Sequence, residues 1–306
     1  MIKLIFLGSD KFPIPLFERL CNSTNTQVVG LVTTPNITEK KLEILAAKMY
    51  KIPIFKPKSI NKEFQNIFDK TKPDIILVCN YGQILSKEIL KYPKHGCLNI
   101  HCSLLPKLRG ACPIEVAILK GLKETGVTIQ LMSEELDTGN ILFQKKVEIK
   151  DNDTAGSLSR KLQKLMVENV EKVIINWTKG KIKPKEQNHS KATFCYRQDK
   201  SKDAARIDWK NTAKEIDRKV RAFNPNSIAW TMLKLPKGAK RLKIFKAKTS
   251  NKDLDIKHGN TKIKEGKLLI QTGKGVLIPE IVQLEGKKKM PTEQFLKGFR
   301  EEIILL

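Results

Sequence analysis

The sequence predicts an α/β protein in which a Rossmann-like domain with a parallel sheet precedes a small, OB-like β-barrel domain. Strand-like and helix-like segments alternate through the first two-thirds of the 306 residues, an order typical of doubly wound sheets. The run IILVC at 75–79 is wholly apolar, as strands buried on both faces of a parallel sheet are. After residue 208, short alternating runs separated by turn residues replace this order, which indicates a small antiparallel barrel.

We expect the first domain to span residues 1–190. Apolar runs predict its strands at 3–7, 28–33, 74–79, 96–101 and 127–132, with an edge strand at 147–149. Helical periodicity predicts its helices at 15–21, 39–49, 86–91, 113–120 and 154–177. Gly121 and Gly180 follow the last two of these helices, where a glycine commonly ends a helix.

The polar residues 191–208 are expected to link this domain to a basic β-barrel at 209–306. One helix is predicted at 211–223, and Asn224 with Pro225 stops it. Alternating runs at 243–247, 267–271 and 276–284 predict strands, and the sequence TGKG at 272–275 predicts a turn between two of them.

Composition restricts the class of protein. The chain is 40% hydrophobic and 29% charged, which is typical of globular proteins, and its apolar runs are too short to cross a bilayer. Its start resembles a first strand rather than a signal peptide, because no small-residue cleavage site follows. We therefore expect a cytoplasmic protein without membrane attachment. A monomer is our expectation for its assembly, although the sequence does not supply the oligomeric state. The six cysteines form no CxxC pair and accompany no histidine cluster, so buried reduced thiols are expected rather than a metal site or disulfides.

The formal net charge of +26 is concentrated toward the carboxyl end. Residues 209–306 carry 23 basic and 10 acidic side chains, a net of +13 over 98 positions, and the other 208 positions also sum to +13. Such a domain is typical of proteins that bind nucleic acid, since neutralised phosphates release counterions. The alternative is a lysine-rich composition whose side chains are simply solvated.

Three polar residues are placed where they could meet. Asn99 and His101 are two apart at the end of a predicted strand, so their side chains point to one face, and Asp137 follows in a predicted loop. Functional side chains of open α/β sheets lie at this carboxyl edge. An amide can donate to an oxygen that becomes anionic, an imidazole can take a proton near pH 7, and a carboxylate can orient the imidazole. The set suits acyl transfer to an amine; alternatively, His101 is a satisfied buried histidine and Asn99 a turn former.

Two other sites are weaker hypotheses. Gly8 and Ser9 follow the first strand, but the residues after them do not complete the GxGxxG pattern of a dinucleotide site. Cys102 could be a thiol nucleophile beside His101, although neighbours on a strand face opposite sides.

The run NIHCSLLPKLRGACPI at 99–114, followed by GVTI at 126–129 and LDTG at 136–139, resembles the 10-formyltetrahydrofolate-dependent formyltransferases. SKDAARIDW at 201–209, RKVRAFNP at 218–225, GKG at 273–275 and GKKKM at 286–290 resemble the junction and second domain of the methionyl-tRNA subfamily. The similarity extends over essentially the whole chain. It implies that a formyl group is transferred from 10-formyltetrahydrofolate to the α-amino group of initiator methionyl-tRNA.

The resemblance also implies roles for individual residues. Asn99 is expected to polarise the formyl oxygen, and His101 to shuttle the proton of the attacking amine. Asp137 is expected to hold the His101 imidazole in the protonation state that this requires. The folate donor is expected against Ser103, Leu104, Leu105 and Pro106, with Tyr81, Gly82, Ile84 and Leu85 as walls of its pocket. Contacts with tRNA are expected from Arg206, Arg218, Arg221, Lys237, Lys240, Arg241, Lys243, Lys246 and Lys248. No metal is expected, because the folate carries the activated carbon.

Two departures from the family pattern concern tRNA rather than the chemistry. The loop at 33–41 is short and lacks arginine and glycine, whereas the family usually has a long basic loop that enters the acceptor stem. Asn226 stands where an aromatic residue usually follows Asn224 and Pro225. The means of selecting initiator tRNA is therefore open, and the lysines of the barrel are one hypothesis for it.

Two other functions remain as alternatives. A sugar-nucleotide N-formyltransferase would use the same donor and can share the sequence IDW, found here at 207–209, but it does not explain the charge of the last third. A non-catalytic RNA-binding protein would explain that charge, but not why Asn99, His101 and Asp137 are all present.

Overall fold

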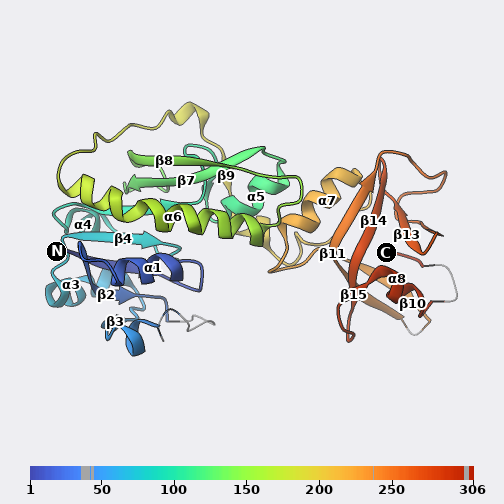
Figure 1. The fold of residues 1–306 in the computed structure, drawn as a ribbon, viewed down its shortest axis with the longest axis horizontal. Helices are drawn as coiled ribbons and strands as arrows, with labels where there is room; N and C mark the ends of the chain where they lie inside the picture. Colours follow the sequence, from blue (N-terminus) through green and yellow to red (C-terminus); the bar gives the residue numbers. More distant parts are fainter. Residues whose placement is uncertain (36–41, 43–44, 237, 300–302) are drawn as a thin grey trace. The chain divides into compact units, whose positions relative to one another are not determined.

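The computed structural model describes residues 1–35, 42, 45–236, 238–299 and 303–306 (Figure 1). The chain forms two compact units. The first comprises Met1–Gly110, Glu124–Glu148 and Ser159–Phe194, and the second comprises Ala111–Lys123, Ile149–Leu158 and Cys195–Leu306. Each unit therefore draws on several segments of the chain, and helix α6 (Ala155–Thr178) contributes residues to both.

The first unit is built on a seven-stranded sheet in the order β3-β2-β1-β4-β5-β7-β8 (Figure 1). Five strands are parallel: β1 (Ile2–Gly8), β2 (Thr26–Val32), β3 (Ile54–Phe55), β4 (Ile75–Cys79) and β5 (Cys97–His101). The hairpin of β7 (Glu124–Leu131) and β8 (Ile141–Glu148) extends the sheet in the antiparallel sense. The predicted α/β architecture is confirmed, but the strand expected at 127–132 runs against its neighbour, and the edge strand begins at Ile141.

Helices cover both faces of this sheet because its buried strands are apolar on both sides. Phe6 of β1 meets Phe17 of α1 (Ile14–Cys21) edge to face, with ring centroids 5.3 Å apart. Arg19 of α1 pairs with Glu171 of α6 at 2.6 Å, so these two helices share that face. The alternate residue Ile5 belongs to the core on the other side, together with buried residues of α3 (Ile60–Thr71) and α4 (Lys87–Lys91).

Two helices show when hydrophobic periodicity predicts a helix and when it does not. Helix α6 buries Leu158, Leu162, Met166, Val170 and Ile174, a stripe at four-residue spacing that predicts it. Helix α3 was not predicted, because INKEFQNIFDKT is mostly polar and buries only four of its residues. Of the helix expected at 39–49, residues 39–41, 43 and 44 lie outside the described residues, and Leu45–Met49 forms a π-helical turn.

The second unit holds a curled antiparallel sheet in the order β10-β11-β14-β13-β12, with β15 paired to β14 (Figure 1). Its strands are β10 (Trp230–Leu235), β11 (Gly238–Ser250), β12 (Thr261–Lys264), β13 (Lys267–Gln271), β14 (Val276–Leu284) and β15 (Met290–Pro291). Ile303 accepts a hydrogen bond from Thr261 of β12, and Leu306 donates to Met232 of β10. The chain end thus bridges the two outer strands, and the barrel-like second domain is confirmed.

The second unit also contains the helices α5 (Pro113–Leu119), α7 (Ala213–Ala222) and α8 (Thr292–Leu296). Helix α7 begins with a capping box, in which Thr212 and Glu215 each satisfy the other's backbone N–H. Ile216 and Val220 of α7 join Trp209 and sheet residues such as Leu242 in the core. No helix within the described ranges is long and apolar enough to cross a membrane.

Candidate functional site

Strand β5 carries Asn99 and His101 to the carboxylate of Asp137. The Nδ2 group of Asn99 donates to Asp137 Oδ1 over 3.1 Å, and His101 Nδ1 lies 3.5 Å from Asp137 Oδ2. The side chains of His101 and Asp137 are 6% and 5% exposed, whereas Asn99 is half-buried. The three residues singled out in the sequence are therefore together, and Asn99 is the most accessible of them.

Two further groups donate to the Asp137 carboxylate. Gln130 Nε2 donates to Oδ1 over 2.8 Å, and the backbone N–H of Gly110 donates to Oδ2 over 2.9 Å. Gln130 pairs with Asn99 across the antiparallel β5–β7 ladder, so both amides lie on one face of the sheet. The sequence prediction missed Gln130. Its signal is a polar side chain at positions 128 and 130, alternating with buried apolar residues in one strand.

Asp137 sits in a turn of unusual backbone geometry. Its φ of +56° is left-handed, which costs an L-residue about 1–2 kcal/mol and is tolerated best by Asp and Asn. A Cβ on Gly139 would lie 1.8 Å from the carbonyl oxygen of Leu131, so only glycine fits there. The LDTG sequence thus contains one residue predicted to serve the chemistry, Asp137, and one that permits the close approach of two backbones, Gly139.

The second nitrogen of His101 is bound to the backbone. His101 Nε2 lies 2.7 Å from the carbonyl oxygen of Leu108, and because a carbonyl only accepts, Nε2 carries the hydrogen. The proton-shuttle role expected for His101 therefore requires this contact to open. Nε2 of His101 faces Leu108 and Nδ1 faces Asp137, so neither nitrogen is directed at the buried thiol of Cys102. The geometry therefore does not favour a nucleophilic pair of these two residues.

The first segment expected to bind folate forms a tight turn after β5. Ser103 Oγ donates to Lys107 O over 2.5 Å, and the backbone N–H of Leu105 donates to Thr128 Oγ1 over 3.1 Å. Ser103 and Leu105 are buried, whereas Leu104 and Pro106 are half-buried. Gln144 of β8 also donates to Leu105 O over 2.7 Å. Strands β7 and β8 therefore hold this turn beside His101.

The second segment expected to bind folate follows β4, and its residues differ in how far they are buried. Ile84 is 77% exposed and Gly82 is exposed, while Leu85 packs in the core against the sheet. Tyr81 is half-buried, and burial together with the nearby charge of Glu63 raises its pKa to about 12. Contact of these residues with folate stays a prediction.

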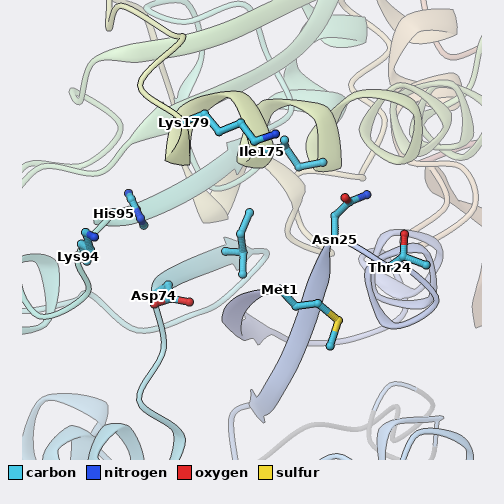
Figure 2. A pocket seen from close by; sticks show the side chains of 9 residues that line it. Met1, Thr24, Asn25, Asp74, Lys94, His95, Ile175 and Lys179 are labelled. Carbon is cyan, nitrogen blue, oxygen red and sulfur yellow. The ribbon is translucent and has the colours of Figure 1, made fainter.

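A cavity of about 410 Å³ lies elsewhere on the first unit, at the edge where β1, β4 and β5 begin (Figure 2). Met1, Asp74 and His95 are among its lining residues, and it includes none of the residues predicted for catalysis or folate binding. Within the described part of the chain, no group of His, Cys, Asp or Glu could hold a metal ion. All six cysteines are described and none forms a disulfide; Cys21 is half-buried and the other five are buried.

The basic residues predicted to contact tRNA fall into three groups, and Lys237 lies outside the described residues. The side chains that solvent reaches freely are Arg206, Lys240, Lys246 and Lys248. Arg241 and Lys243 of β11 are half-buried, and the Arg241 guanidinium lies 4.2 Å from the centroid of the Trp230 ring. Arg206 also lines a cavity of about 410 Å³ in the second unit with Lys210 and His258.

Glu280 of β14 reduces the free charge of this surface. Lys246 Nζ and Lys248 Nζ lie 2.9 and 2.6 Å from its two carboxylate oxygens. Hydrogen bonds from Lys248 and then Lys246 hold the pKa of Glu280 below its ordinary value. One carboxylate therefore partly neutralises two of the lysines predicted to contact phosphate.

Arg218 and Arg221 of α7 are engaged within the second unit. The Arg218 guanidinium lies 2.3 Å from where a Cβ of Gly121 would be, just beyond the carboxyl end of α5, an end that favours cations. Arg221 Nε donates to Asp217 over 2.8 Å, and its Nη1 donates to the carbonyl of Asp153 over 3.0 Å. Both side chains thus stabilise the fold, and their contact with tRNA stays a prediction.

Both parts of the chain match models of known protein families. Residues 4–174 match the model described as formyl transferase, and residues 200–300 match formyl transferase, C-terminal domain. The methionyl-tRNA formyltransferase of Bacillus cytotoxicus is 36% identical over 319 residues, covering 99% of this chain and 98% of its own. The enzyme of the same name from Bacillus thuringiensis subsp. konkukian is 35% identical over 315 residues, with the same coverage of both chains.

Solved structures share the fold at lower identity. An N-formyltransferase from Helicobacter canadensis, solved with folinic acid and dTDP-3-aminofucose, has a TM-score of 0.66 and 20% identity, covering 91% of this chain and 99% of its own. A 4-N formyltransferase from Francisella tularensis has a TM-score of 0.61 and 26% identity, covering 74% of this chain and 91% of its own. The first of these likenesses concerns the fold alone.

Proposed function

The chain belongs to the formyltransferase family, and we propose that it transfers a formyl group from 10-formyltetrahydrofolate to the α-amino group of initiator methionyl-tRNA. The observation that carries this function is the 36% identity to a methionyl-tRNA formyltransferase across 99% of the chain, second unit included. The net charge of +13 over residues 209–306 supports a polyanionic acceptor as well. A sugar-nucleotide acceptor would leave that charge without a purpose.

Asn99 is the residue assigned to the formyl oxygen. The folate donor supplies an activated one-carbon unit, and the attack of an amine turns its carbonyl oxygen into an oxyanion. One Nδ2 hydrogen of Asn99 is donated to Asp137 Oδ1, which fixes the plane of the amide and polarises it, and the second is assigned to the oxyanion. Asn99 is half-buried, so substrate can reach it, while its partners Asp137 and Gln130 are buried and fix its position.

His101 is assigned to the proton that the amine loses. Once the contact with Leu108 O opens and the ring hydrogen has moved to Nδ1, which faces Asp137 Oδ2, the vacated Nε2 takes up this proton, and Asp137 stabilises the resulting imidazolium through Nδ1. The bond between the amine nitrogen and the formyl carbon forms, the bond from that carbon to the folate nitrogen breaks, and the folate nitrogen accepts a proton. Asp137 therefore serves both partners: Oδ1 orients Asn99, and Oδ2 faces His101.

One assay tests the acceptor. Folate donor with a labelled formyl carbon is offered with charged initiator tRNA, with an amino-sugar nucleotide, and without acceptor. We expect label on methionyl-tRNA at a rate well above the other two reactions. Label on the sugar nucleotide and not on tRNA would overturn the proposed acceptor, and label on neither would overturn the proposed activity. Comparing the rates on initiator and elongator methionyl-tRNA then tests selectivity. Equal rates would mean that an enzyme with the short loop at 33–41 no longer distinguishes the two tRNAs.

A further inference from the structure

A buried amide, Gln187, contacts the turn that carries Asp137. It follows α6 in an extended segment that pairs with β8 through Lys185 and Ile141, and it is 4% exposed. Its Nε2 donates to the carbonyl oxygens of Asp137 and Gly139 over 2.9 and 2.7 Å. The two hydrogens of one amide thus bind the backbone on both sides of Thr138.

Arg109 fixes the direction of this amide. Gln187 Oε1 accepts from Arg109 Nη2 over 2.8 Å, so its NH2 group must point the other way, toward the turn. The next residue, Gly110, donates its N–H to Asp137 Oδ2 over 2.9 Å. The pair Arg109–Gly110 therefore reaches Asp137 twice, at the carboxylate directly and at the main chain through Gln187.

The direction of the Asp137 carboxylate depends on this turn. Asp137 has a left-handed backbone with φ of +56°, and a free chain would leave that conformation readily. A rotated Asp137 peptide would carry Oδ1 away from Asn99 and Oδ2 away from His101. Hydrogen bonds from Gln187 to the carbonyls of Asp137 and Gly139 oppose this rotation.

We infer that Gln187 is a positioning residue for formyl transfer, whose amide holds the Asp137 turn and through it aims the carboxylate at Asn99 and His101. The inference rests on the proposed function. It adds to the site a segment that lies beyond the sequences carrying Asn99, His101 and Asp137, and it gives Arg109 the task of orienting Gln187.

Gln187→Met tests this role because methionine has nearly the same length and volume but cannot donate to the two carbonyls. We expect kcat to fall about 10- to 100-fold, the range that a small misplacement of catalytic groups costs. The KM values for folate donor and charged tRNA should stay within about twofold, since the buried side chain meets neither substrate. Gln65→Met, the same change at an exposed site of α3, is the matched control and should leave kcat unchanged.

A double-mutant cycle with Asp137→Asn separates positioning from a general loss of stability. If Gln187 acts through Asp137, Gln187→Met should slow the Asp137→Asn enzyme by less than about twofold. Losses that multiply, or an unchanged kcat in Gln187→Met, would overturn the inference. If circular dichroism shows Gln187→Met unfolded at the assay temperature, Gln187→Asn, with a shorter amide, takes its place in the cycle. Wild-type enzyme that formylates only an amino-sugar nucleotide would refute the proposed acceptor, while the cycle could still be measured with that acceptor.

Discussion

Replacing Asp137 by asparagine perturbs the site with almost no change of shape. The carboxylate accepts from Asn99 and Gln130 at one oxygen and from Gly110 at the other, which also faces His101. An asparagine has a single acceptor oxygen, so its NH2 group must confront either the two side-chain amides or the Gly110 N–H. In the first orientation two hydrogen bonds are lost and in the second one bond is lost, and in both the negative charge opposite His101 is removed.

The size of the effect follows from this count. Each buried hydrogen bond to a charged group contributes about 1.5–3 kcal/mol, so losing one or two weakens the support of Asn99 and His101 by roughly 1.5–6 kcal/mol. At about 1.4 kcal/mol for each factor of ten, turnover should fall about 10-fold to 10,000-fold. Single-turnover formylation of charged initiator tRNA with labelled donor measures it. Asp151→Asn, where the carboxylate is 94% exposed, is the control. An Asp137→Asn enzyme within about threefold of wild type would refute the assigned role of the carboxylate.

Three other outcomes are expected. Asn99→Ala removes the proposed oxyanion donor and should lower kcat about 100-fold with an unchanged unfolding temperature; near-normal turnover would remove Asn99 from the mechanism. Binding to tRNA should weaken steeply as the salt concentration rises. Glu280→Gln frees Lys246 and Lys248, so it should tighten binding and steepen the slope of log K against log salt by about one. The control Glu265→Gln, on the same unit, should change neither the affinity nor the slope. Hydrogen bonds from the Thr212 backbone and then its side chain lower the pKa of Glu215, so its stabilising effect is complete above the ordinary pKa of Glu and is lost as pH falls through the lowered value. Glu215→Gln should therefore reduce the free energy of unfolding by about 0.5 kcal/mol near neutral pH and by nothing in acid, as denaturant titrations at several pH values would show; a difference that persists in acid would contradict this.

The sequence predicts the part of the site that depends on local geometry. Asn99 and His101 share a face because strand side chains alternate, and they meet Asp137 as expected. Gln130 could not be predicted in the same way, because its place opposite Asn99 follows from the reversed direction of β7. An apolar run does not reveal the direction in which a strand pairs. Gln187 lies in a segment without periodicity, so only the folded chain shows what it contacts.

Charge counts are limited for a similar reason. They predict a cationic second unit, but they treat all basic side chains alike. Arg218 lies at the end of α5 and Arg221 binds Asp217, whereas Lys240 is exposed to solvent. The difference depends on which carbonyls and carboxylates the fold brings near each cation, and it separates residues that stabilise the unit from those free to meet phosphate.

The hydrogen bonds of Gln187 also set the order in which the site is completed during translation. The chain from 99 to 137 contains Asn99, Gly110 and Gln130, which donate to the Asp137 carboxylate. Gln187 is synthesised 50 residues after Asp137. At elongation rates of about 5–20 residues per second, Gln187 is added to the chain roughly 3–10 seconds after Asp137. If Gln187 has the proposed role, a nascent chain contains Asn99, His101 and Asp137 before the residue that holds their turn in place, and we expect full activity only when the segment after α6 has been made.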